Sequence, residues 1–332
     1  MHPRPPYHPI ARTLLAVMLA SAGTIAIAQQ ASVAQQTVDT LDQLSGGPHA
    51  GYRANHAKGL IAGGIFTPSP EAASISKAVH FRRSVGVTVR YSTGTGVPTI
   101  PDTNPNSRPF GMAIRFALPG GSYTDVVGIS HNGFPVSNPE DFLGLLSAVA
   151  QSRKSDAKPS PIETFLGAHP AALAFVQAPK PMPASFATQS FFGVNAFEFT
   201  NEQGKSVFGR YQIVPMDGDQ SLTEEQAAQL APNYLMEELA QRVTAKPTKY
   251  KVLLQIANKD DVTDDPTVVW PSDRTLIELG TLIINRVVPD AKDIEKKLAY
   301  NPLALPDGIK PSNDPVLLYR PVAYAVSVGR RQ

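Results

Sequence analysis

The sequence contains no cysteine among its 332 residues. This excludes a disulfide framework, a thiolate metal site and a thiol nucleophile, so the fold has to be stabilised by a packed core. Charged residues are also sparse, at 17% of the chain, and the net charge is only +2. Lysine and arginine are scattered, and no basic stripe that would follow a phosphate backbone is visible. We therefore expect no nucleic-acid partner.

Hydrophobic residues make up 42% of the sequence, which is typical of a globular protein of this length. A chain of this size suffices for one large domain with a well-buried core. Its 31 prolines are spread along the chain without a repeat. This distribution predicts long irregular connections rather than a proline-rich tail.

The first 28 residues differ from the rest. Arg4 and Arg12 precede an apolar run over residues 13–27, and the sequence Ala26-Ile27-Ala28 provides the small residues that a signal peptidase reads. The run is shorter than the roughly 20 residues of a membrane-spanning helix. We therefore predict a secretory signal peptide over residues 1–28, a periplasmic location and no stable membrane insertion after cleavage. An uncleaved anchor is the alternative.

Residues 29–47 are polar and rich in small side chains, and we expect a flexible N-terminal arm there. A single domain is expected over residues 48–332. Within it, residues 85–92, 112–119 and 123–130 alternate β-branched with polar side chains between clusters of Gly, Pro and Asn. This alternation predicts strands of an antiparallel sheet or barrel.

Helix-start signals come later in the chain. Asn138 is followed by Pro139 and two acidic residues, and Ser160 with Glu163 forms a capping-box pattern. A helical pair divided by Pro232 follows, and further strands are expected in the segments 195–200, 206–214, 251–257 and 281–287. A β-rich core with helices gathered toward the C-terminal half predicts an α+β fold.

Five of the seven histidines lie beyond the predicted signal peptide. His56 stands in a polar segment, RANHAKG, ahead of the predicted strands. Imidazole titrates near neutrality and suits acid–base catalysis, but a single histidine in a loop is more often a surface residue. Its spacing alone assigns it no function.

The segment RANHAKG resembles the distal motif R-x-x-H-A-K-G of the catalases. Further segments resemble catalase motifs in the same order: VTVRYST, RPFGMAIRFALPGGSYTDVVG, NGFPV, VVWP, LGTLIINRV and, over residues 320–324, RPVAY. Together they extend over most of residues 48–332. The resemblance implies an antiparallel β-barrel with helices packed around it, a C-terminal helix that carries the haem ligand, and haem b as the cofactor.

On the distal side of the haem, the resemblance implies that His56 is the acid–base residue. Ser92 would hydrogen-bond the imidazole and fix its orientation. Asn132 would donate a hydrogen bond to the bound peroxide. The spacing around this segment differs from that of large catalases, which leaves His131 as an alternative to Asn132.

On the proximal side, the resemblance implies that Tyr324 ligates the iron and that Arg320, one helical turn earlier, stabilises its phenolate. Pro321 restricts Arg320, so we expect the helix to start or kink there. Further haem contacts are implied for four residues. The propionates would meet Arg53, Arg90 and Arg331, and the porphyrin would pack on Phe142.

The chain continues for only eight residues after Tyr324. It thereby resembles the small exported catalase-related peroxidases, which implies reduction of peroxide with a small organic electron donor and weak or no catalase activity. Two alternatives stay open. One is a haem-dependent isomerase or lyase of fatty-acid hydroperoxides, and the other is a periplasmic haem-binding protein without turnover. The sequence assigns neither the donor nor an oligomeric state.

Overall fold

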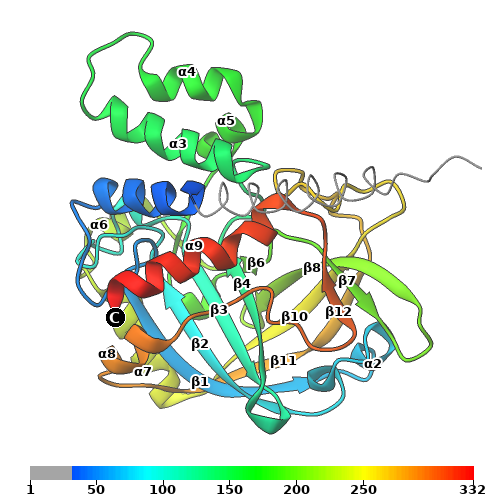
Figure 1. Cartoon of the computed structure of the whole chain (residues 1–332). Coiled ribbons are helices and arrows are strands. Elements are labelled where there is room, and N and C mark those ends of the chain that lie inside the picture. The colour runs from blue at the N-terminus through cyan, green and yellow to red at the C-terminus, as the bar shows by residue number, and fades with distance from the viewer. Residues whose placement is uncertain (1–31) are drawn as a thin grey trace, which may run out of the picture.

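The computed structural model describes residues 32–332. Within this part of the chain, eight antiparallel strands close into a barrel (Figure 1). They follow the order β10-β11-β1-β2-β3-β4-β6-β8, and β8 pairs with β10 to complete the circle. The barrel strands are β1 (Gly59–Pro68), β2 (Val85–Ser92), β3 (Gly111–Ala117), β4 (Tyr123–Ile129), β6 (Phe191–Phe192), β8 (Ser206–Pro215), β10 (Thr248–Ile256) and β11 (Leu276–Val287).

Shorter strands continue the sheet beyond the barrel. Strand β7 (Phe197–Thr200) pairs with β8, and β12 (Ile309–Pro311) pairs with β7. A separate pair joins β5 (Met182–Pro183) to β9 (Ser221–Leu222). The strands predicted at residues 85–92, 112–119 and 123–130 are confirmed within one or two residues at their ends.

Strand β2 shows how the barrel separates its core from the candidate site. Val87, Val89 and Tyr91 are buried in the main core cluster. Because side chains alternate across a strand, Arg90 and Ser92 point away from that core. Both are nevertheless buried, at 3% and 4% exposure. The outer face of the barrel at this end of β2 is therefore covered by other segments, and the candidate site lies between them and the sheet.

Aromatic side chains fill the barrel. Tyr91, Phe186 and Tyr250 are fully buried, and the hydroxyl groups of Tyr91 and Tyr250 are hydrogen-bonded at 3.0 Å. Tyr250 in turn donates to the backbone carbonyl of Phe186 at 2.8 Å. Both buried hydroxyls therefore have partners, as a stable core requires.

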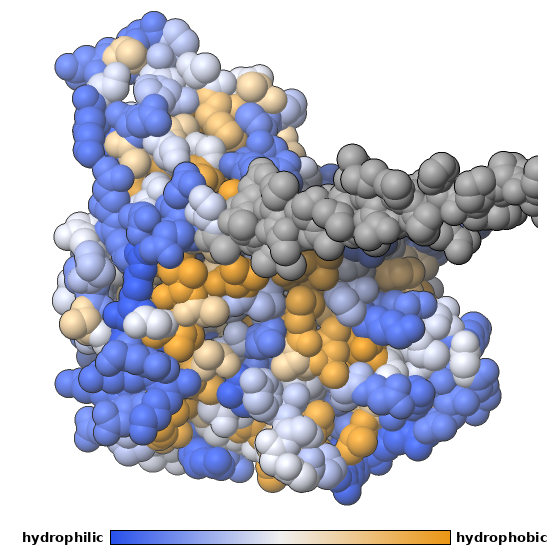
Figure 2. All heavy atoms as spheres, in the orientation of Figure 1, coloured by the Kyte–Doolittle hydropathy of each residue, from blue (hydrophilic) through white to orange (hydrophobic). Residues whose placement is uncertain are grey.

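Helix α9 (Pro315–Arg331) crosses one face of the barrel, and a helix over residues 32–44 lies beside it (Figure 1). Figure 2 shows hydrophobic surface across the middle of this face, with hydrophilic residues at its margins. Three helices project above it: α3 (Pro139–Ser152), α4 (Pro161–Ala168) and α5 (Pro170–Gln177). The remaining helices are α2 (Ala72–Ile75), α6 (Glu224–Ala228), α7 (Tyr234–Ala245) and α8 (Lys292–Lys297).

The predicted helix starts are confirmed. The side chain of Asn138 accepts a hydrogen bond from the Asp141 backbone at 2.8 Å and caps α3. Ser160 and Glu163 form the reciprocal capping box at the start of α4. The mixture of one barrel and surrounding helices confirms the α+β class.

The expectation of a flexible arm over residues 29–47 is wrong for most of that segment, because residues 32–44 are helical. Val33 packs in a cluster with Tyr319 of α9, and Arg330 of α9 forms ion pairs with Asp39 and Asp42. The residues that form each contact lie nearly 300 positions apart in the chain, so local composition could not reveal the contacts. The predicted signal peptide, residues 1–28, lies outside the described residues.

One of the two alternatives for Pro321, a helix start at this residue, is wrong. Helix α9 begins at Pro315, where Asp314 caps it by accepting from the backbone of Val316 at 2.8 Å and Leu317 at 3.1 Å. Pro321 lies inside the helix. The loss of one backbone hydrogen bond there is tolerated because the helix is anchored on both sides of it. In residues 32–332, no helix is both long and apolar enough to cross a membrane.

Candidate active site

His56 lies in the loop that leads into β1, with its ring against strands β2 and β3. Its Nδ1 is 3.1 Å from the Oγ of Ser92. The backbone of His56 has a φ of 55°, a left-handed conformation that is uncommon for a residue with a side chain. A Cβ at Gly111 of β3 would stand 2.9 Å from the His56 Nδ1 and 2.7 Å from the Ser92 Oγ. Only glycine leaves room here for the imidazole and its partner.

Two anchors fix the segment around His56. The buried ammonium group of Lys58 pairs with Asp102 at 2.7 Å and donates to the carbonyls of Ile100 and Pro232, each at 2.9 Å. The backbone of Ala54 donates to the Oγ of Ser327 in α9 at 3.2 Å. The second contact ties this loop directly to the C-terminal helix.

The environment of His56 lowers the pKa of its imidazole to about 4. Burial is the main cause, and the positive charge of Arg90 is the next. Arg320 on α9 and Arg53 lower the pKa further, while a hydrogen bond involving the backbone of Thr93 opposes them. The ring is therefore neutral near pH 7. The charge of Arg320, which is expected on the proximal side, acts on the same imidazole as the charges of Arg53 and Arg90.

Asn132 lies in the loop after β4, close to the His56 strands. The last residue of β4, Ile129, is paired with Gly111, and the Oγ of Ser130 accepts from the Phe110 backbone at 3.0 Å. The ring of neighbouring His131 packs edge-on against Phe175 of α5, with 4.9 Å between centroids. The aromatic contact occupies the His131 side chain, whereas the described contacts assign Asn132 no partner.

Phe142 lies in the first turn of helix α3 and packs against Phe134, with ring centroids 5.4 Å apart. Both rings are half-buried. The described contacts therefore pair Phe142 with another aromatic ring and do not link it to His56 or Tyr324.

Arg320 and Tyr324 meet on α9 despite the intervening proline. The Nε and Nη2 of Arg320 lie 3.0 and 2.9 Å from the Tyr324 Oη. The Nη1 of Arg320 donates to Asn195 at 2.6 Å, and the amide of Asn195 donates to Asp314 at 2.6 Å. Asp314 is also the cap of α9. A chain of hydrogen bonds therefore joins the start of the helix to the phenol oxygen.

The three remaining arginines converge at the end of α8. Arg90 places its Nε 2.8 Å from both carboxylate oxygens of Glu295, and Arg53 also pairs with Glu295. The carbonyl oxygen of Leu298 accepts from Arg53 at 2.7 Å and from Arg331 at 2.8 Å. Arg331 is 4% exposed. These arginines come from the His56 loop, β2 and α9, so folding brings together residues from distant parts of the sequence.

Sequence reasoning did not identify three residues of the site, and two of them have no signal in the sequence. Asn195 is the first residue of a predicted strand, and Glu295 stands in the charged segment KDIEKK; each residue type is ordinary at its position. Asp314, followed by Pro315, is a helix-cap pattern that could have been found. Only the fold shows that Asn195 contacts Arg320 and that Glu295 contacts the arginines.

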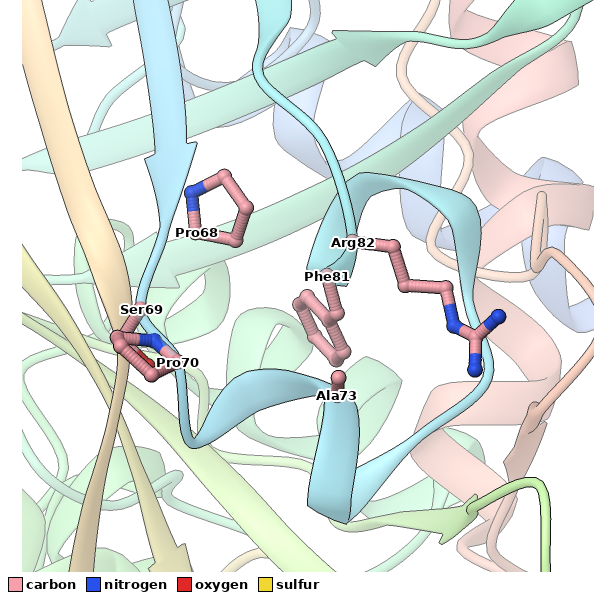
Figure 3. Close-up of a pocket in the computed structure, with 6 residues that line it drawn as sticks. All are labelled: Pro68, Ser69, Pro70, Ala73, Phe81 and Arg82. Atoms are coloured by element: carbon pink, nitrogen blue, oxygen red, sulfur yellow. The ribbon is translucent and has the colours of Figure 1, made fainter.

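A shallow hollow lies elsewhere on the molecule, near the end of β1 and helix α2 (Figure 3). Its one charged side chain, Arg82, is paired with Glu202 at 2.9 Å. It shares no lining residue with the cluster around His56 and Tyr324. The hollow is lined by Pro68, Ser69, Pro70, Ala73, Phe81 and Arg82.

Residues 35–331 match the family described as Catalase. The chain is 33% identical over 325 residues to a catalase-related peroxidase of Synechococcus elongatus, covering 96% of this chain and 94% of that protein. It is 35% identical over 300 residues to a catalase-related peroxidase of Mycolicibacterium paratuberculosis, covering 89% and 94%. A catalase of Latilactobacillus sakei is 26% identical, with 82% of this chain and 60% of that protein covered.

Solved structures show the same fold. Catalase A from Saccharomyces cerevisiae superposes with a TM-score of 0.75 at 21% identity, over 84% of this chain and 61% of that one. A bacterial catalase superposes with a TM-score of 0.74 at 26% identity, over 85% and 58%. The sequence match, which extends over nearly the whole described chain, and the shared barrel lead to one conclusion. The chain belongs to the catalase family.

Proposed function

We propose that the protein is a haem-dependent peroxidase that reduces hydrogen peroxide or organic peroxides with a small organic electron donor, with weak or no catalase activity. As a member of the catalase family it is an oxidoreductase that acts on peroxide. The observation that carries the proposal is the pair of donors that Arg320 directs at the Tyr324 oxygen, at 3.0 and 2.9 Å. Two cationic donors on one phenol oxygen suit a negatively charged ligand.

The residues present fit haem b. Tyr324 would ligate the iron from α9, and Arg53, Arg90 and Arg331 would receive the two propionates. Phe142 would pack on the porphyrin at the start of α3. When bound, the haem would supply the redox chemistry: two electrons pass to the peroxide as its O–O bond breaks, and two electrons are regained from the organic donor. The fit rests on an excess of buried positive charge, three arginines against one carboxylate in the described contacts.

His56 would move the proton of the peroxide. With its pKa lowered to about 4, the imidazole is neutral at physiological pH and has one nitrogen able to accept a proton. In the tautomer in which Nδ1–H donates to the Oγ of Ser92, this hydrogen bond orients the ring and leaves Nε2 as the acceptor. His56 then takes the proton from one peroxide oxygen and returns it to the departing oxygen. Gly111 and the strained backbone hold the ring at the site.

Asn132 would donate a hydrogen bond to the peroxide. The pairing of Ile129 with Gly111 supports this placement, because it sets the start of the Asn132 loop beside the strand that His56 touches. The contact of His131 with Phe175 favours Asn132 over His131 in this role. A preorganised donor of this kind contributes about 3 kcal/mol to a transition state.

The substrate proposal is tested by adding hydrogen peroxide with a phenolic donor, hydrogen peroxide alone and a lipid hydroperoxide to separate samples of the full-length, haem-loaded protein. We expect donor oxidation in the first sample, with little oxygen release in the second. Isomerisation of the lipid hydroperoxide without donor oxidation would show the isomerase or lyase alternative. A haem-loaded protein inert to all three would be a binding protein.

We also propose that the protein is exported to the periplasm and loses residues 1–28. The support is the pattern of basic, apolar and small residues at the start of the sequence. N-terminal sequencing of the protein recovered from periplasmic extracts should begin close to residue 29. Recovery of the full-length chain in the membrane fraction would favour the uncleaved anchor.

A further inference from the structure

Helix α8 is a short surface helix with one side chain directed inward. Its residues are exposed except Glu295, whose carboxylate side chain is only 19% exposed. Ile294, an apolar residue, remains 45% exposed on the same helix. The helix therefore contributes little to the core. Its polar contacts with the rest of the protein are made by the Glu295 carboxylate and by the backbone carbonyls at its C-terminal end.

The Glu295 carboxylate binds the arginines that are expected to receive haem propionates. Both of its oxygens lie 2.8 Å from the Nε of Arg90, and Arg53 forms a second ion pair with it. Burial raises the pKa of Glu295, but the positive charges of Arg90 and Arg53 outweigh burial and keep it below its usual value. Glu295 is therefore ionised near pH 7 and occupies guanidinium donors of two arginines.

The cluster still holds more positive than negative charge. Among the described residues, Glu295 is the carboxylate paired with Arg53 and Arg90, and Arg331 bonds to backbone carbonyls instead. Burial, and then the charge of Arg90, lowers the pKa of the Arg53 guanidinium to about 9 and also lowers that of Arg331. A molecule that brings carboxylates to these arginines would relieve this repulsion.

We propose that Glu295 is an internal counter-ion that holds Arg53 and Arg90 in the haem-free protein and is displaced by a haem propionate. The inference rests on the proposed haem function and concerns how the pocket is loaded. A propionate and the Glu295 side chain are both carboxylates and compete for the same planar donors. Because α8 lies on the surface, the displaced side chain can turn toward water without opening the core.

The first test compares hemin affinity, followed by Soret absorbance, between the haem-free full chain and its Glu295→Gln variant. Glutamine keeps the size and one hydrogen-bond acceptor but removes the competing charge, so we expect about tenfold tighter hemin binding. Asp293→Asn is the control, because Asp293 is exposed on the same helix and its substitution removes the same charge. It should bind hemin like the wild type.

The second test separates competition for the arginines from a general change in the pocket. Protoporphyrin IX and its dimethyl ester are titrated by fluorescence, since the ester lacks carboxylates. The Glu295→Gln variant should gain affinity for the diacid only, and its haem-free form should melt at a lower temperature than the wild type. Equal gains for both porphyrins, or unchanged or weaker hemin binding, would overturn the inference alone. A wild-type protein that binds no hemin would overturn the proposed function as well.

Discussion

The His56 loop and helix α9 hold their candidate functional residues by different means. His56 is held by close packing against the sheet, where Gly111 and Ser92 leave its ring a narrow space. Tyr324 is held by a chain of polar contacts that passes through Arg320 to Asn195. Small changes of shape should therefore damage the His56 side, whereas changes of charge or hydrogen bonding should damage the Tyr324 side.

The largest effect is expected from Tyr324→Phe, which removes the oxygen that Arg320 contacts and leaves the rest of the ring in place. We expect loss of stable haem incorporation, because the iron loses its only proposed protein ligand. The measurement is the ratio of Soret to protein absorbance after reconstitution with hemin. Full occupancy with an unchanged spectrum would remove Tyr324 from the proximal side.

The His56→Ala variant should separate haem binding, which depends on the Tyr324 side, from the reaction with peroxide, which depends on the His56 side. Haem occupancy should be retained, while the reaction with peroxide should slow by about 100- to 10,000-fold, the usual contribution of acid–base catalysis. Stopped-flow absorbance after mixing with hydrogen peroxide measures the rate. Traces that match the wild type would show that another group moves the proton.

The packing of the His56 ring is tested by Gly111→Ala. The added methyl group would stand 2.7 Å from Ser92 Oγ and 2.9 Å from His56 Nδ1, so one of them has to shift. We expect peroxide reactivity to fall by roughly 10- to 100-fold with haem retained, since small misplacements of catalytic groups cost this much. Gly86→Ala on β2 is the matched control, because its Cβ meets no atom within 4 Å. Equal rates in both variants would contradict the packing argument.

The polar chain on α9 is tested by Asn195→Ala. The change leaves Arg320 and the buried Asp314 without their shared partner, which destabilises the protein by about 1–3 kcal/mol. We expect about tenfold weaker hemin binding and little change in the rate of peroxide reaction per bound haem. A slower reaction at full haem occupancy would show that Asn195 also acts on the distal side.

The smallest effect is expected from pH. Since the pKa of His56 is lowered from 6.5 to about 4, its ring stays neutral as the pH falls from 7 to 5. The rate of peroxide reaction should stay nearly constant over that interval and decline as the pH passes through about 4. Stopped-flow rates at constant Soret absorbance measure the profile. A half-loss of rate near pH 6.5 would show an unperturbed imidazole.

The sequence could predict the parts of the molecule that depend on local pattern or on shared motifs. The strands near β2, β3 and β4 follow from alternation, and the starts of α3 and α4 follow from their caps. Strand β1 has no such signal, because its run GLIAGGIFTP lacks alternation and contains three glycines. The helix over residues 32–44 was missed because its stability comes from α9, which lies at the other end of the chain.

In the candidate site, too, some residues could be predicted from motifs and others only from the fold. Motifs could suggest His56, Arg320 and Tyr324, and the structure brings Arg320 and Tyr324 within hydrogen-bonding distance. The contact of Glu295 with Arg53 and Arg90 joins residues more than 200 positions apart and has no sequence signature. Partners of this kind depend on how the barrel and α9 meet, which only the fold reveals.

We propose above that Tyr324 and His56 face a haem iron from opposite sides. The most direct test is the absorption spectrum of the purified full-length protein after hemin reconstitution, recorded before and after addition of hydrogen peroxide. We predict a Soret band that is lost in Tyr324→Phe and that changes rapidly with peroxide in the wild type but slowly in His56→Ala. The absence of a Soret band in the reconstituted wild-type protein would contradict the account.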